Sequence, residues 1–280
     1  MKLDLEELNV DSLIQMLKAS FSFENWDAMI EIADKLHEQI SIIYENNSNL
    51  IRGTKLKRSI PYYFGYSSCA KGIALQKTGK YDEAKLCIQK YADLGWIVGL
   101  DEEGIYEVEY YRNIAKANSY VIDLLEGKMG VLHKYVEFIR KSDDEELLPG
   151  LITILESSII HDYSVDWILK EFKINVDDIG EHETIVNIKY HEDYIYLLAM
   201  YYYKQENLYD TINTILEILL LSIKLDDDTG FKKSAALFEL LRDHADQSQL
   251  KVHHNIMKTI IEKEFTRSFS SRIEFSKIHS

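Results

Sequence analysis

The chain has 280 residues, of which 46% are hydrophobic, and a formal net charge of −15. An acidic surface repels phosphate backbones, so we do not expect this chain to contact nucleic acid directly. The two cysteines argue against a disulfide framework and fit a reducing, cytoplasmic compartment. No secretory signal is visible in the acidic start MKLDLEELNVDS, and the most apolar run, 212–225, is too short to span a membrane.

Two prolines and twelve glycines are few, which favours a nearly all-helical chain. Apolar residues recur at helical spacing along most of the sequence, with polar turns between the runs. The expected helices span residues 10–20, 26–36, 62–77, 81–93, 101–126, 131–140, 164–172, 184–204, 209–224, 228–244 and 247–265. A further helix runs to residue 160; a capping-box signal at 142–145 marks its start, and Pro149 favours the alternative start near Leu147. We expect residues 173–183 to form a connection and residues 266–280 to form a tail.

The turn at 78–80 joins two helices that carry small residues where they would face each other. Gly72 lies in the middle of the first helix, where glycine costs about 1 kcal/mol relative to alanine, so we expect a packing reason for it. Opposite Ala84 it would let the two helices approach closely, with Tyr81 over the turn. These residues resemble the small, aromatic and small positions of a tetratricopeptide (TPR) repeat. The resemblance implies an all-α, right-handed, TPR-like solenoid of about six antiparallel helix pairs, forming a single domain over 1–265.

No catalytic or metal-binding pattern is visible in the sequence. The His-Glu pairs at 37, 182 and 191 each lack the second histidine of a zinc motif. The run 226–230 lacks the alternating acidic positions of a calcium loop, so it predicts a capped helix start with Asp228 or Thr229 as N-cap. We therefore expect no enzyme activity, no cofactor and no metal.

One face of the expected helix 101–126 carries side chains suited to binding a peptide. Asn113 can both donate to and accept from a peptide backbone, tyrosines beside it add apolar contact and hydroxyls, and Lys116 could meet a carboxylate. The alternative is an ordinary solvated face. The stripe comprises Tyr106, Tyr110, Asn113, Ala117 and Tyr120, with Lys116 at its edge, and helical spacing places it opposite the core residues.

A second stripe lies on helix 184–204, and it consists of Asn187, Tyr190, Tyr194 and Tyr201. Both stripes lie on the first helix of a pair, which lines the concave surface in a TPR-type solenoid. Asn118 points about 140° away from Asn113. We interpret Asn118 as a structural link between helices, with a ligand contact as the alternative.

The polar segment before residue 60 carries a basic run, which is either a solvated loop or a contact point for an acidic partner. Its members are Arg52, Lys55, Lys57 and Arg58.

The run GLDEEGIYEVEYYRNIAKANSYVIDLLEG, followed by ELLPGLITILES, resembles the C-terminal helical-repeat region of Gram-positive helix-turn-helix transcription regulators, the peptide-sensing Rap, NprR, PlcR and PrgX group. The resemblance implies a regulatory domain that binds a short signalling peptide in its groove, signals by conformational change and often forms homodimers. It also implies that asparagines hold the peptide backbone, and Asn113 is the matching position. We find no helix-turn-helix before residue 10, so direct DNA binding would need a missing domain. The alternative function is a protein–protein interaction scaffold without a small ligand.

Overall fold

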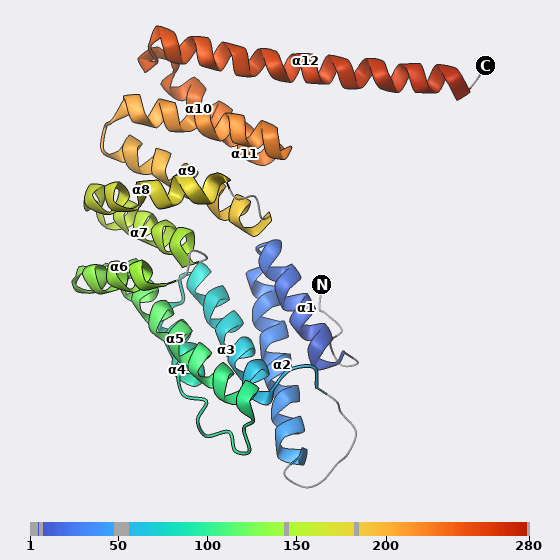
Figure 1. The fold of residues 1–280 in the computed structure, drawn as a ribbon, viewed down its shortest axis with the longest axis vertical. Helices are drawn as coiled ribbons and strands as arrows, with labels where there is room; N and C mark the ends of the chain where they lie inside the picture. Colours follow the sequence, from blue (N-terminus) through green and yellow to red (C-terminus); the bar gives the residue numbers. More distant parts are fainter. Residues whose placement is uncertain (1–4, 6–7, 48–55, 143–145, 182–184, 279–280) are drawn as a thin grey trace. The chain divides into compact units, whose positions relative to one another are not determined.

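The computed structural model describes residues 5, 8–47, 56–142, 146–181 and 185–278, and the side chains of 47, 174–181, 185–189 and 263–278 lie outside that description. All regular structure in these ranges is helical (Figure 1), which confirms the predicted all-α class. The contacts within the chain divide into two compact units, residues 1–138 and 139–280.

The first unit is built from consecutive helices that pack on their neighbours in sequence. Helices α2 and α4 each pack between the helices before and after them, while α3 also contacts α5 and, more lightly, α1. This pattern places α1, α3 and α5 in one layer. The elements are α1 (Val10–Ser22), α2 (Trp26–Asn47), α3 (Ile60–Lys77), α4 (Tyr81–Ala92), α5 (Glu102–Leu125), the 3-10 turn η1 (Met129–Val131) and the start of α6 (Leu132–Lys141).

Gly72 lies at a close contact between α3 and α4, as the sequence predicts. A β-carbon added at Gly72 would lie 3.3 Å from Cys87 Cβ and 3.7 Å from the backbone oxygen of Ala84. Tyr81, the first residue of α4, is partly buried against the same core. The small residues therefore permit close helix packing, and Cys87 belongs to the core.

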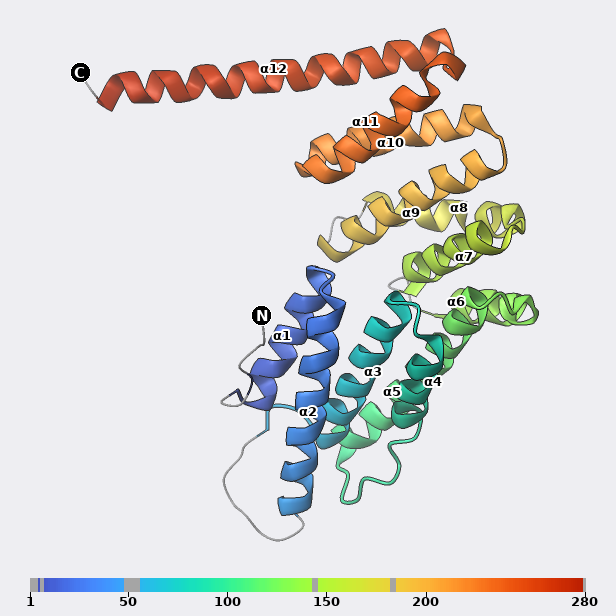
Figure 2. The same ribbon diagram turned by 180° about the vertical axis from the view of Figure 1, so that it is seen from behind.

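The second unit continues with paired helices, and α10 lies at its centre. Helix α10 packs against α9 and α11, and also contacts α12, while α9 packs on α7. Figures 1 and 2 both show α10 and α11 side by side. The elements are the end of α6, α7 (Leu147–His161), α8 (Asp166–Glu181), α9 (Ile185–Lys204), α10 (Leu208–Leu225), α11 (Asp228–Leu241), the 3-10 turn η3 (Arg242–His244) and α12 (Gln247–Ile278).

Three local predictions differ from the structure. Helix α8 continues to Glu181 through the expected connection, and α12 continues to Ile278 through the expected tail. Neither stretch contains proline, and serine is only mildly unfavourable in helices, so nothing in their composition stops helix propagation. The N-cap of α11 is Asp227, one residue before the predicted pair, because its carboxylate accepts hydrogen bonds from the backbone nitrogens of Thr229 and Gly230 at 3.1 and 2.8 Å.

Candidate functional site

Helix α5 presents the first part of the predicted stripe to solvent. The helix starts at a capped end, because the Asp101 carboxylate accepts a hydrogen bond from the Gly104 backbone nitrogen at 2.8 Å. Tyr106 and Tyr110 follow, 65% and 45% exposed, with their rings stacked at 6.3 Å and 20°. Asn113 and Lys116 are exposed as well. The period of the sequence thus predicted correctly that these four side chains are exposed.

The second part of the stripe is covered. Ala117 is only 8% exposed, so it leaves no open space for a ligand. Tyr120 is half-buried, with its ring 6.0 Å from that of Tyr135 and 6.3 Å from that of Phe138. Both partners lie on α6, which covers the end of α5. The exposed stripe therefore ends at Lys116, and Tyr120 contributes to packing between helices.

Two tyrosines of α3 extend the exposed tyrosines of α5 into a broader surface. Tyr62 and Tyr66 are half-buried and stacked at 5.6 Å and 28°. Helix α3 packs on α5, and the hydroxyl of Tyr111, the residue after Tyr110, is hydrogen-bonded to the backbone oxygen of Tyr62, so the two tyrosine pairs lie on neighbouring, packed helices. We call Tyr62, Tyr66, Tyr106 and Tyr110 the tyrosine face. Tyr62 and Tyr66 are four residues apart in the sequence, which places them on one helix face, but the sequence analysis did not assign them to a binding surface.

Buried packing beneath the tyrosine face fixes the distance between α3 and α5. Tyr111 is buried, and its hydroxyl donates a hydrogen bond to the backbone oxygen of Tyr62 at 3.2 Å. Its ring lies directly on Gly65, where an added β-carbon would come within 2.2 Å of the ring. Only a glycine at position 65 admits this arrangement, so the tyrosine face rests on a rigid contact.

Arg58 lies at one end of the tyrosine face and is held by three groups of its own chain. Its guanidinium carbon lies 4.4 Å from the Tyr62 ring centre, its Nε donates to Glu103 Oε1 at 2.8 Å, and its Nη2 donates to Glu107. The hydrogen bond that Arg58 donates to Glu103 is the main cause that raises the pKa of Arg58. Burial raises the pKa of Glu107, and Arg58 opposes that shift.

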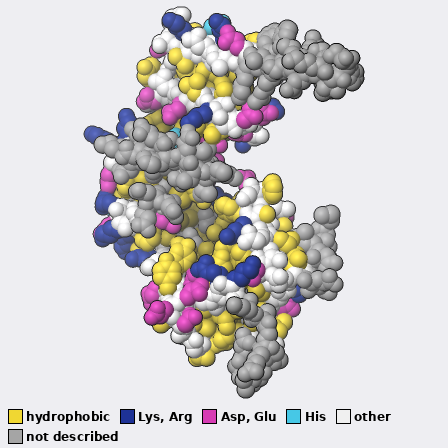
Figure 3. Space-filling view, turned by 45° about the vertical axis from the view of Figure 1, so that its right-hand side comes forward, with side chains coloured by type: hydrophobic (Ala, Val, Ile, Leu, Met, Phe, Trp, Pro, Cys, Tyr) yellow, Lys and Arg dark blue, Asp and Glu magenta, His cyan; other side chains and the backbone are white. Residues whose placement is uncertain are grey.

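One member of the basic run before residue 60 thus forms ion pairs within the protein. Arg58 pairs with carboxylates of α5, which neither of the two sequence interpretations included. Lys57 is exposed, and Arg52 and Lys55 lie outside the described residues. On the side of the 1–138 unit visible in Figure 3, hydrophobic side chains form patches with basic and acidic side chains between them.

Asn118 links three consecutive helices, as the sequence favoured. Its Nδ2 donates to the Tyr91 hydroxyl of α4 at 2.8 Å and lies 3.9 Å from Cys69 Sγ of α3. Burial raises the pKa of Tyr91, which keeps this hydroxyl protonated. Asn118 therefore has a structural role, and Asn113 is the only one of the two amides on the exposed stripe.

The predicted second stripe on α9 is mostly buried. Tyr194 and Tyr201 are 6% and 1% exposed, and Tyr190 is half-buried. The Tyr201 hydroxyl donates to Asp166 Oδ1 at 2.8 Å and accepts from the Val165 backbone nitrogen at 3.1 Å. Because α9 lies between α7 and α10, these tyrosines pack inside the unit and offer no continuous ligand surface. Asn187 lies outside the residues whose side chains are described.

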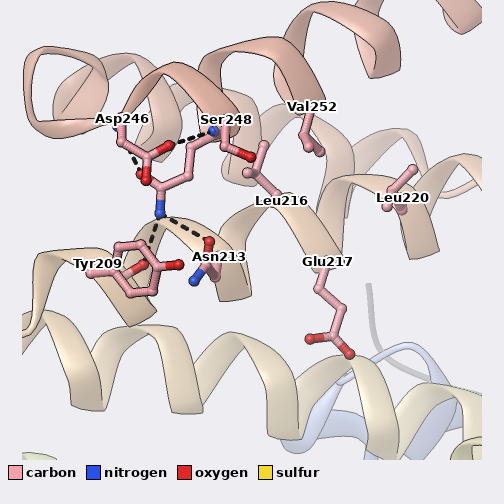
Figure 4. A pocket seen from close by; sticks show the side chains of 9 residues that line it. Tyr209, Asn213, Leu216, Glu217, Leu220, Asp246, Ser248 and Val252 are labelled. Atoms are coloured by element: carbon pink, nitrogen blue, oxygen red, sulfur yellow. Dashed lines mark hydrogen bonds between the residues drawn. The ribbon is translucent and has the colours of Figure 1, made fainter.

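A shallow pocket of about 270 Å³ lies between α10 and α12 (Figure 4). Gln249 closes the polar end of the pocket; it is buried, and both polar atoms of its side chain are hydrogen-bonded. The Gln249 side chain accepts from the Asp246 backbone nitrogen at 3.0 Å and donates to the Tyr209 backbone oxygen and to Asn213 Oδ1 at 3.1 and 2.9 Å. Asp246 in turn accepts from the Gln249 backbone nitrogen at 2.8 Å, which completes a reciprocal cap. These groups fasten α12 to α10 and leave no polar atom of Gln249 for a ligand.

Comparison with protein-family models, with curated proteins and with solved structures finds no match to this chain. Among the described residues, no group of histidine, cysteine and acidic side chains could hold a metal ion. Within the same ranges, every helix is too short or too polar to cross a membrane. The described part of the chain is thus all-helical, and its first unit carries the tyrosine face on α3 and α5.

Proposed function

We propose that this chain is a TPR-like regulatory protein whose 1–138 unit binds a short peptide, or an extended segment of a protein, on the tyrosine face. The observation that carries the proposal is the stacked, exposed pair Tyr106 and Tyr110 on α5, together with the stacked pair Tyr62 and Tyr66 on α3, the helix that packs on α5. Exposed rings of this kind supply a large, rigid contact area at little cost in conformational entropy.

Asn113 completes the surface, because its exposed amide can donate to and accept from the main chain of a ligand. In this proposal the protein works by binding, without catalysis, in the cytoplasm. Ligand binding biases a conformational change or dimerisation, as the resemblance to peptide-sensing regulators implies. A scaffold that binds only a folded partner is the competing function, and the test below distinguishes the two.

The test compares the tyrosine face with an exposed tyrosine elsewhere on the chain. A library of short peptides is screened by thermal melting, because a specific ligand stabilises the fold by mass action. The variants Tyr106→Ala and Tyr110→Ala should each weaken binding of any hit about tenfold, equivalent to about 1.4 kcal/mol. Tyr209→Ala is the matched control, because Tyr209 is 61% exposed and lies in the other unit.

Two outcomes would contradict the proposal. If no peptide shifts the melting temperature, the scaffold is favoured. If the hits lose as much affinity with Tyr209→Ala as with Tyr106→Ala, the peptide binds elsewhere.

A further inference from the structure

The pocket between α10 and α12 has a polar end and an apolar end, and the proposed function uses neither. Figure 4 shows Asp246, Ser248 and Tyr209 at the polar end, and Leu220 and Val252 at the other. All of these residues belong to the 139–280 unit, so the pocket shares no residue with the tyrosine face. The chemistry of the two ends indicates what kind of small molecule fits the pocket.

The polar end offers three oxygen acceptors to a ligand. Asp246 Oδ1 accepts a hydrogen bond from the Gln249 backbone nitrogen at 2.8 Å, while no described residue donates to Oδ2 or forms an ion pair with this carboxylate. The side-chain hydroxyls of Ser248 and Tyr209 likewise form no hydrogen bond with any residue that the structure describes. An ammonium group carries three donors and no acceptor, so these oxygens match its requirements.

The apolar end offers hydrocarbon surface that is exposed to water. Leu220 and Val252 are 52% and 38% exposed, and Leu216, which lies between the two ends, is 5% exposed. A hydrocarbon chain lying over these side chains removes apolar surface from water, which favours binding. The volume of about 270 Å³ corresponds to about nine water-sized groups of about 30 Å³ each, which is enough for an ammonium group and about six carbons.

The charge of the lining selects against anions. The lining residues include the acidic Asp246 and Glu217 and no lysine, arginine or histidine. In Figure 4 the Glu217 carboxylate points away from α12, so it contributes to the local potential and not to a direct contact. The net charge of −15 also attracts cations. We infer that the pocket binds a small aliphatic amine in its cationic form, with the ammonium group at Asp246 and the hydrocarbon chain over Leu220 and Val252.

The test uses four probes, n-hexylamine, n-hexanol, hexanoate and n-butylamine, each titrated against the full chain and followed by ligand-observed proton NMR. The first three carry similar hydrocarbon chains and differ in the charge of the head group. We expect hexylamine to bind about tenfold tighter than hexanol, because the ammonium group adds charge-assisted hydrogen bonds, and hexanoate to bind more weakly than hexanol. Butylamine should bind about fivefold more weakly than hexylamine, because it buries two fewer methylene groups.

Variants assign the two contacts to single residues. Asp246→Asn removes the charge but keeps a side chain that caps a helix equally well, so it should abolish the preference for the amine over hexanol. Val252→Thr keeps the shape of the side chain but makes it polar, so it should reduce the difference between hexylamine and butylamine. Asp228→Asn and Val98→Thr are the matched controls, because both residues are exposed and lie outside the pocket, and they should leave both preferences unchanged. Circular dichroism verifies that each variant folds.

Three outcomes would overturn the inference. If hexanol binds as tightly as hexylamine, the pocket recognises only hydrocarbon. If Asp228→Asn lowers the preference for the amine as much as Asp246→Asn does, the preference comes from net charge and the site assignment is wrong. If none of the probes binds, the pocket does not take an aliphatic amine. Peptide binding by the tyrosine face is measured with other ligands and other variants, so the proposed function stands or falls separately.

Discussion

Replacing Gly65 by alanine tests whether the contact beneath the tyrosine face is as tight as the structure shows. In an unconstrained helix the change from glycine to alanine stabilises by about 1 kcal/mol. Here the new β-carbon would lie 2.2 Å from two ring carbons of Tyr111, a buried side chain whose hydroxyl is hydrogen-bonded to α3. The ring cannot swing outward without losing that bond, so strain exceeds the gain in helix propensity. We expect a net loss of about 1–3 kcal/mol.

Gly72→Ala is the matched control on the same helix. Its β-carbon would lie 3.3 Å from Cys87 Cβ, which requires a shift of only a few tenths of an ångström. The gain in helix propensity offsets most of that cost, so we expect a change within about 1 kcal/mol of the wild type. A leucine at position 72 would overpack the same contact and cost about 1–3 kcal/mol.

The assay is thermal melting followed by circular dichroism, with hydrogen exchange of the α3 and α5 amides to locate the change in the 1–138 unit. For a domain of this size, 1 kcal/mol corresponds to roughly 4 °C in Tm. Gly65→Ala should therefore melt several degrees below Gly72→Ala. If Gly65→Ala melts at or above the wild type, Tyr111 does not rest on Gly65 and the account of the tyrosine face is wrong.

Two further predictions concern the remaining polar contacts. Asn118→Ala should lower the stability of the ligand-free protein by about 1–3 kcal/mol, because the buried Tyr91 hydroxyl loses its hydrogen-bond donor. Asn113→Ala should change the stability by no more than about 0.5 kcal/mol. Equal losses of stability for the two variants in urea titrations would refute this contrast. Burial, reinforced by Arg242, lowers the pKa of His253, whose ring stacks 3.8 Å from that of Phe238. Because the folded pKa lies below the unfolded value of 6.5, stability should fall as pH drops below about 6.5. His253→Phe should reduce this fall in melts between about pH 8 and pH 5, and an unchanged profile would count against it.

The sequence predicts features that depend on the period of a single helix. The exposure of Tyr106, Tyr110 and Asn113 follows from helical spacing, and so does the inward position of Asn118. The close approach at Gly72 is also predictable, because its partner helix follows directly after a short turn.

Features that depend on where a later helix packs are not predictable in this way. Tyr120 is covered because α6 returns over the end of α5, and Tyr194 is buried because α9 has a neighbour on both sides. A helical period identifies which residues share a face, but it does not reveal how many faces are covered. The Arg58–Glu107 ion pair is even harder to predict from the sequence. Its members lie 49 residues apart, and only the packing of α3 on α5 brings them together.

The amide of Asn118 has a consequence for the order in which the first unit assembles. Its contacts with Cys69 on α3 and Tyr91 on α4 need the hairpin of α3 and α4 to be formed and α5 to be docked on it. In a chain that grows by stacking each helix on its neighbours, such a contact closes late. Asn118 should therefore have a low φ-value, and its loss should speed unfolding while hardly slowing folding. Asn118 thus contributes to kinetic stability, because it affects how long the assembled unit persists more than how quickly the unit forms.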